Sequence, residues 1–69
     1  MNTEKTLETT YQKIALAYRA AVVAHEEAAE LLDAAGFPRP AKNQRDAAFK
    51  TTMRAITYER RAQSTAVTD

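Results

Sequence analysis

His25 is the only histidine in the 69-residue chain, and the segment His25-Glu26-Glu27-Ala28-Ala29 begins like the helix of a zinc protease. That motif needs a second histidine four residues later, so that two ring nitrogens converge on one metal ion. Position 29 is alanine. We therefore predict no metal and no cofactor, and interpret His25 as a packed residue whose ring finds a carbonyl, a carboxylate or a symmetry mate. A pH-sensitive dimer interface is the alternative, because a buried histidine charges on acidification.

The other reactive side chains form no catalytic pattern. Nucleophilic catalysis needs a nucleophile held beside a base, but the chain has no cysteine, and Ser64 lies in the small polar C-terminal segment. The carboxylates around Glu26 and Asp33 are typical of a solvated or ion-paired helix face. One glycine is too few for a phosphate-binding loop. We predict that the protein is not an enzyme.

One long helix should carry most of these side chains. Thr3 can cap its start, and Glu4 places negative charge near the positive end of the helix dipole. From Glu4 to Ala35 there is no glycine or proline, and Gly36 stands where helices commonly end. The sequence predicts a helix over residues 4–35.

The segment after Gly36 predicts a stiff turn, because Pro38 and Pro40 each fix their own φ and bias the preceding residue toward extended conformations. Phe37 is expected to pack against the helix ends. A second helix should begin near Pro40 or Ala41, or else at Asn43.

The second helix should end near Ala62, before a segment without apolar periodicity. Residues 1–63 are therefore expected to form an all-α, two-helix antiparallel hairpin with a long first helix and a shorter second one. Residues 64–69 are expected to form a flexible tail.

The apolar pattern of the first helix is wider than one neighbour can cover. Ala15, Val22 and Ala29 widen its main stripe on one side, and Ala17, Ala24 and Leu31 widen it on the other, to an arc of roughly 200°. The main stripe has alternating spacings of four and three residues, the heptad pattern of packed helices: Leu7, Tyr11, Ile14, Tyr18, Ala21, His25, Ala28, Leu32 and Ala35.

A homodimer accounts for this arc. One packing contact needs a stripe of about 100°, so the first helix should touch at least two others. A chain this short buries little surface alone, and oligomerisation remains where disulfides and metals are absent. We expect two hairpins to form a two-fold symmetric four-helix bundle. The candidates for its core are Leu7, Tyr11, Ile14, Tyr18, His25, Leu32, Phe49, Met53 and Ile56.

Charge divides the chain into two halves. Residues 1–36 carry six acidic and three basic side chains, whereas residues 37–69 carry seven basic and three acidic ones. Lys50, Arg54 and Arg61 should form a basic stripe on the second helix. They could contact the phosphates of a nucleic acid, or could simply be solvated or face the acidic first helix. The sequence pI of 8.1 is below the value of about 9 typical of nucleic-acid-binding domains.

Leu16 and Val23 are unexpected, because they flank Arg19 on the polar side of the first helix. They could be covered by a bundle interface or be isolated exposed residues. Alternatively, the two side chains form a docking strip for another protein, with Arg19 as its polar anchor. We take Leu16, Arg19 and Val23 as candidate partner-binding residues.

No segment predicts a membrane partner. The longest nearly uncharged stretch, residues 14–24, contains Arg19 and is shorter than the roughly 20 residues that a membrane span requires. The first residues lead into no apolar signal region. We expect a cytoplasmic protein, which the absence of cysteine also favours.

The chain resembles small phage-encoded inhibitors of bacterial host proteins. The resemblance covers the whole chain and rests on its length, its abundant alanine, its one long helix, the Gly36-Phe37-Pro38 turn and a basic second helix. Among these inhibitors, the chain is similar to the helical-hairpin anti-activators of quorum-sensing transcription factors. The resemblance implies a dimer that acts in the host cytoplasm and occludes a surface of a host regulator. The alternative is a nucleic-acid-binding helical bundle that acts as a small regulator.

Overall fold

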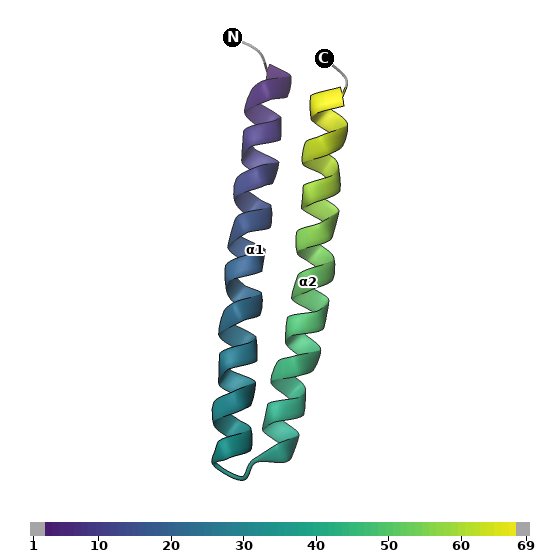
Figure 1. Ribbon diagram of the computed structural model, residues 1–69. Helices are drawn as coiled ribbons and strands as arrows, with labels where there is room; N and C mark the ends of the chain where they lie inside the picture. Colours follow the sequence, from purple (N-terminus) through teal and green to yellow (C-terminus); the bar gives the residue numbers. More distant parts are fainter. Residues whose placement is uncertain (1–2, 68–69) are drawn as a thin grey trace.

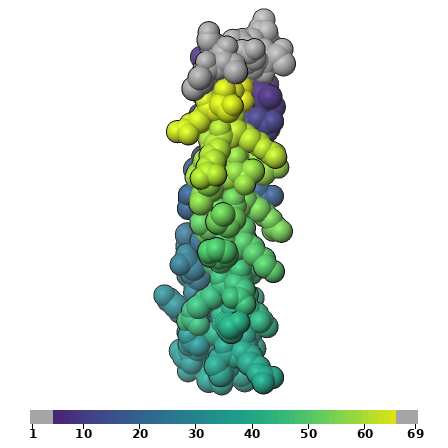
Figure 2. Space-filling model, turned by 90° about the vertical axis from the view of Figure 1, so that its right-hand side faces the viewer, coloured from purple at the N-terminus to yellow at the C-terminus, as the bar shows by residue number. Residues whose placement is uncertain are grey.

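Two antiparallel helices joined by a tight turn make up the molecule (Figure 1). The computed structural model describes residues 3–67, and the side chains of residues 5–65. Helix α1 spans Thr3–Ala34, and helix α2 spans Pro38–Val67. The hairpin is a narrow rod of 53 × 15 × 10 Å (Figure 2). The expected all-α hairpin, with a slightly shorter second helix, is confirmed.

Gly36 ends α1 as the sequence predicted. Its φ is +86°, a left-handed conformation that residues with a Cβ rarely adopt. The N–H of Gly36 donates to the carbonyl of Asp33 at 3.0 Å, and the N–H of Phe37 donates to the carbonyl of Leu32 at 2.9 Å. These two hydrogen bonds form a Schellman motif, which satisfies carbonyl groups that the helix end would leave unpaired.

Helix α2 starts earlier than expected. It begins at Pro38, because Pro38 and Pro40 both lie in the first turn, where backbone N–H groups have no partner within the helix. The carbonyl of Phe37 accepts the first hydrogen bond, from the N–H of Ala41 at 3.1 Å. The expected start near Pro40 or Ala41 is therefore wrong, and Asn43 lies inside the helix. Phe37 is 55% exposed, so the prediction that it packs against the helix ends is also wrong.

The other ends of the helices also differ from expectation. Helix α1 includes Thr3, the residue expected to cap it, but the Thr3 side chain lies outside the described part. Helix α2 continues to Val67, five residues beyond the end expected at Ala62. Residues 64–67 are thus helical, and residues 68–69 lie outside the described residues. Among residues 3–67, neither helix is long and apolar enough to cross a membrane.

The interface between the helices is a regular heptad seam, which we call the inner seam. Ala41, Ala48, Ala55 and Ala62 recur every seven residues on α2, and all four are buried. Ala15 and Ala29 are the buried residues on the facing side of α1. Each residue of the inner seam is buried or half-buried: Glu8, Tyr11, Ala15, Tyr18, Val22, His25, Ala29 and Leu32 on α1, and Ala41, Gln44, Ala48, Thr51, Ala55, Tyr58, Ala62 and Thr65 on α2.

The inner seam is rotated from the stripe expected for α1. Tyr11, Tyr18, His25 and Leu32 face α2 as predicted, but Ala15, Val22 and Ala29 complete the seam in place of Ile14, Ala21 and Ala28. Small side chains on both helices let the two backbones approach closely, because the distance between packed helices depends on the side chains at the contact. As a result, the fully buried positions of this hairpin hold no large side chain.

Candidate functional site

Arg19 and Glu59 form an ion pair between the two helices. The Arg19 Nε lies 2.8 Å from Glu59 Oε2, and the Arg19 Nη2 lies 2.9 Å from Glu59 Oε1. This two-pronged geometry matches the planar guanidinium to the carboxylate. The hydrogen bond from Arg19 lowers the pKa of the Glu59 carboxyl below its ordinary value and raises the pKa of the Arg19 guanidinium. Both side chains remain nearly half exposed.

A second ion pair lies on the same side of the hairpin, closer to the turn. The Arg45 guanidinium of α2 donates to the carboxylate of Asp33 on α1. This hydrogen bond is the main reason that the pKa of Arg45 is raised. Lys42 and Asp46 make a longer contact of 3.4 Å within α2. We call the side that carries Arg19–Glu59 and Arg45–Asp33 the ion-pair face.

Two shallow hollows lie on the ion-pair face, on either side of Arg19–Glu59 along the rod. The hollow nearer the chain ends is largely apolar, although Glu8 and Glu59 line it, whereas the other is more polar and contains both arginines of the ion pairs. The first is lined by Glu8, Gln12, Ala15, Leu16, Glu59, Ala62 and Gln63. The second is lined by Arg19, Val22, Glu26, Glu30, Arg45, Ala48, Phe49 and Thr52.

Large apolar side chains lie in or near these hollows. Leu16 is 69% exposed and Val23 is 55% exposed, and they stand seven residues apart on the same side of α1. Phe49 of α2 lines the second hollow and is 69% exposed. Ile56 follows Phe49 by seven residues and is half-buried. Of the three candidate residues, Leu16 lines the first hollow and Arg19 lines the second together with Phe49, whereas Val23 lines neither.

His25 lies in the inner seam and has a polar partner. Its Nδ1 is 2.7 Å from Oε1 of Gln44, a contact in which the ring nitrogen can donate to the amide oxygen. This matches the prediction of a packed histidine with a hydrogen-bonding neighbour, although the acceptor is a side-chain amide. Among residues 3–67, no group of three or more histidine, aspartate or glutamate side chains is arranged to hold a metal ion.

An aromatic cluster joins the helices nearer the chain ends. The Tyr58 ring lies 5.8 Å from the ring of Tyr11 and 5.8 Å from that of Tyr18, centre to centre. The Arg61 guanidinium lies 4.9 Å from the centre of the Tyr58 ring, a cation–π contact. Tyr58 therefore stabilises the hairpin and also orients one residue of the basic stripe.

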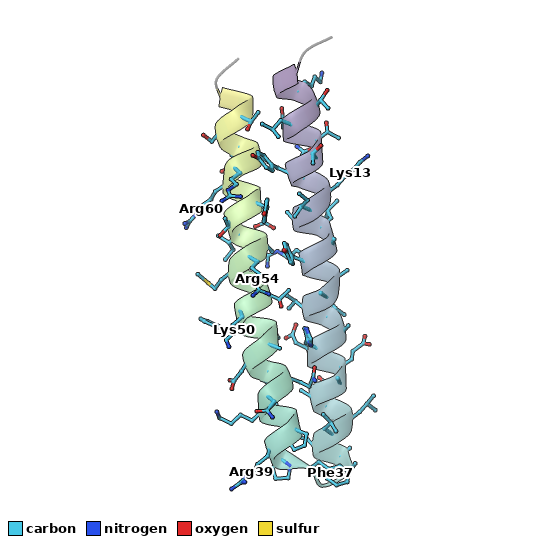
Figure 3. The ribbon with its side chains drawn as sticks, turned by 180° about the vertical axis from the view of Figure 1, so that it is seen from behind. Lys13, Phe37, Arg39, Lys50, Arg54 and Arg60 are labelled. Atoms are coloured by element: carbon cyan, nitrogen blue, oxygen red, sulfur yellow. The ribbon has the colours of Figure 1, made fainter. Side chains whose placement is uncertain are left out.

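The residues of the basic stripe do not all lie on the outside of α2. Lys50 points away from α1, as does Arg60 (Figure 3). By contrast, Arg61 lies over Tyr58 beside the inner seam, and Arg54 stands seven residues before Arg61 on the same side of α2. Within the described residues, neither Lys50 nor Arg54 has a carboxylate close enough for an ion pair. The carboxylates of the interhelical ion pairs, Asp33 of α1 and Glu59 of α2, lie on the ion-pair face and pair with other arginines, so they do not neutralise this stripe.

Several candidates for the dimer core lie outside the inner seam. Phe49 and Met53 are exposed on α2 and do not share the buried face of Ala48, Ala55 and Ala62. A shift of one residue along a helix rotates a side chain by about 100°, which turns Phe49 away from the position of Ala48. Leu7 and Ile14 are displaced from the inner seam by the same rotation. A role in dimerisation for these four residues requires a second copy.

Leu7 and Ile14 belong to a second heptad pattern on α1, which we call the outer seam. It is the inner seam shifted back by one residue. It carries no charged residue, and α2 leaves most of it uncovered: five of its eight members are exposed, among them Leu7 at 42% and Leu31 at 72%, while Ile14, Ala21 and Ala28 are half-buried. The outer seam consists of Leu7, Thr10, Ile14, Ala17, Ala21, Ala24, Ala28 and Leu31.

Sequence reasoning missed the contributions of Glu59 and Phe49 to the ion-pair face. The partner of Arg19 depends on the rotation of both helices, and the apolar arc of α1 alone allows several rotations. The seven-residue repeat Ala41, Ala48, Ala55 and Ala62 would have located the seam of α2. That seam places Glu59 and Thr52 at its edge, facing the side of α1 that carries Arg19.

No model of a known protein family matches the chain, and neither a curated protein nor a solved structure is detectably similar to it.

Proposed function

We propose that this chain is a small homodimeric binding protein that acts without catalysis, by covering a surface of another protein. One observation carries the proposal: exposed Leu16 and Phe49 line the hollows on either side of the Arg19–Glu59 ion pair, and exposed Val23 lies one helical turn from Arg19. Apolar side chains around a fixed polar pair are typical of protein-binding surfaces, where the apolar groups contribute affinity and the polar groups set orientation.

The proposed dimer forms a four-helix bundle. Its support is the small amount of apolar side chain that one hairpin buries: among residues 5–65, the buried positions are alanines and Thr51, whereas seven large apolar residues are exposed. Isolated helices are marginal in water, and most helix stability comes from packing an apolar face. A second hairpin would supply the packing that one chain lacks.

The proposed target is a bacterial transcriptional regulator, such as a quorum-sensing activator. This part rests on the resemblance to phage-encoded helical-hairpin inhibitors, whose expected action is to occlude a host regulator in the host cytoplasm. Occlusion suits a rod with an exposed apolar face, because it requires a complementary surface and no reaction chemistry.

A reporter gene driven by a quorum-sensing activator tests the proposal in cells. Expression of the wild-type chain should lower reporter output, and a Leu16→Asp, Val23→Asp double variant should not. Both positions are exposed, so the variant should keep its helical circular dichroism. A purified activator should bind the wild-type chain after nuclease treatment and should not bind the variant. Equal binding of both chains would remove the ion-pair face as the docking surface.

Nucleic-acid binding is the second candidate, favoured by the unpaired Lys50 and Arg54 on the basic stripe. A complex held by phosphate contacts weakens steeply as salt rises, since binding releases condensed counterions. A triple variant, Lys50→Gln, Arg54→Gln, Arg61→Gln, should then lose binding to duplex DNA or RNA in a gel-shift assay at low salt. Salt-independent binding to a protein target, unchanged in this variant, favours the first candidate.

A further inference from the structure

We infer that a second copy of this chain docks on the outer seam, with its own α1 packed antiparallel against α1. The inference rests on the proposed dimer and does not depend on the proposed target. It assigns the dimer interface to the outer seam and leaves the ion-pair face free.

The position of the outer seam fits a four-helix arrangement. A helix turns by about 100° per residue, so a shift of one residue places the outer seam about 100° from the inner seam. Helices in a four-helix bundle contact two neighbours on adjacent sides, close to a right angle. Helix α1 therefore presents one seam to α2 and an equivalent, largely uncovered seam to a further helix.

The outer seam is complementary to itself when two copies run antiparallel. Its middle consists of small residues from Ala17 to Ala28, and larger side chains stand toward both ends. An antiparallel pair can place Leu31 opposite Leu7 of the partner subunit while the alanines meet at the centre. The same surface then serves both copies, as a two-fold symmetric interface requires.

Charge favours the antiparallel direction. Lys13 and Glu27 both lie on the outer flank of this seam, and Lys13 projects from α1 on the side away from α2 (Figure 3). In the register that pairs Leu31 with Leu7, Lys13 comes within about two residues, about 3 Å along the axis, of the level of Glu27 of the partner subunit. The two-fold axis generates a second, identical pair of Lys13 and Glu27. A parallel dimer would instead place Lys13 at the same level as Lys13 of the partner subunit, so two like charges would be opposed.

The ion-pair face is less suited to a second copy. The two hollows on it contain Glu8, Glu26 and Glu30 beside the ion pairs. Burying these carboxylates against an identical face would remove their hydration without an equal number of unpaired cations. The outer seam itself contains no charged residue, although Arg54 and Arg61 of α2 lie on the same side of the hairpin, one residue before Ala55 and Ala62 of the inner seam.

Neighbouring residues on the two surfaces give a matched test. Ala24 lies on the outer seam and Val23 lies on the ion-pair side, and both are exposed. Ala24→Glu should weaken the dimer about tenfold or more, because it buries an unpaired charge, whereas Val23→Glu should leave the dimer intact. Sedimentation equilibrium measures the dimer affinity, and circular dichroism shows whether each variant keeps its helices.

Two further variants test the direction of packing. Lys13→Glu and Glu27→Lys should each weaken the dimer, and the double variant should restore it. Leu7→Cys and Leu31→Cys chains, mixed and oxidised, should form mixed disulfides in preference to like pairs. Preferred like pairs would contradict the antiparallel direction.

The outcomes separate this inference from the proposed function. A wild-type chain that stays monomeric at high concentration overturns both the proposed dimer and this interface. A wild-type dimer that Val23→Glu disrupts and Ala24→Glu does not overturns the interface alone. A dimer sensitive only to Ala24→Glu and to the charge reversals supports it.

Discussion

The guanidinium of Arg19 holds both carboxylate oxygens of Glu59, at 2.8 and 2.9 Å, and so links two residues that are forty positions apart. The pair can form only at this rotation of α1 relative to α2, because each side chain projects from the edge of the inner seam.

Exchanging the two charges tests this ion pair. Arg19→Glu alone places two carboxylates together and should lower the Tm, and Glu59→Arg alone should do the same by bringing two cations together. The combined exchange should recover most of the loss, because it restores an ion pair at the same place. Thermal unfolding followed by circular dichroism gives the three values. Additive losses in the double variant would show that the two residues do not interact.

The Glu59 carboxyl should also make stability depend on pH. Its pKa is lowered from the ordinary value of 4.5, chiefly by the hydrogen bond from Arg19. A lowered pKa in the folded state means that the ion pair contributes stability above the ordinary carboxyl range and loses it as pH falls through the folded pKa. The Tm difference between the wild-type chain and Glu59→Gln should therefore be present at neutral pH and vanish in acid. A difference that stays constant into acid would contradict this origin.

Ala55 tests the close approach of the helices. It is fully buried in the inner seam, so Ala55→Leu should push the helices apart and lower the free energy of unfolding by about 1–3 kcal/mol. Ala20→Leu is the control, since Ala20 is exposed on α1 and leucine favours helices nearly as much as alanine. Urea denaturation measures both. Equal stability of the two variants would mean that the seam accommodates large side chains.

Gly36 tests the turn. A Cβ at this position would meet no other atom within 4 Å, so a substitution is opposed only by the left-handed backbone. Gly36→Ala should lower the free energy of unfolding by about 1–2 kcal/mol. Gly36→Asn should cost less, because asparagine adopts this conformation more readily. The reverse order would indicate that the turn changes its backbone conformation.

Some of these features could be predicted from the sequence, and others depend on the packing of the two helices. Gly36 predicted the end of α1 because its requirement is local to one residue. Pro40 did not identify the first residue of α2. Proline is compatible with any position in the first helical turn, where N–H groups have no partner within the helix, so Pro38 and Pro40 could each begin the helix. The neighbours of Arg19 could not be predicted from the wide arc of α1, because several rotations bury similar apolar area. The alanine repeat of α2 selects one of them.

The turn at Gly36 joins the two helices at one end of the rod, and both chain ends lie at the other (Figure 1). The two helices are thus covalently joined at the turn alone, and their other ends are held together only by the contacts between them. Local opening should begin at the end that carries both termini, so amide hydrogen exchange should become slower along each helix toward the turn at Gly36. A fusion partner attached at either terminus would lie about a full rod length from the turn, at the end of the hairpin where local opening begins.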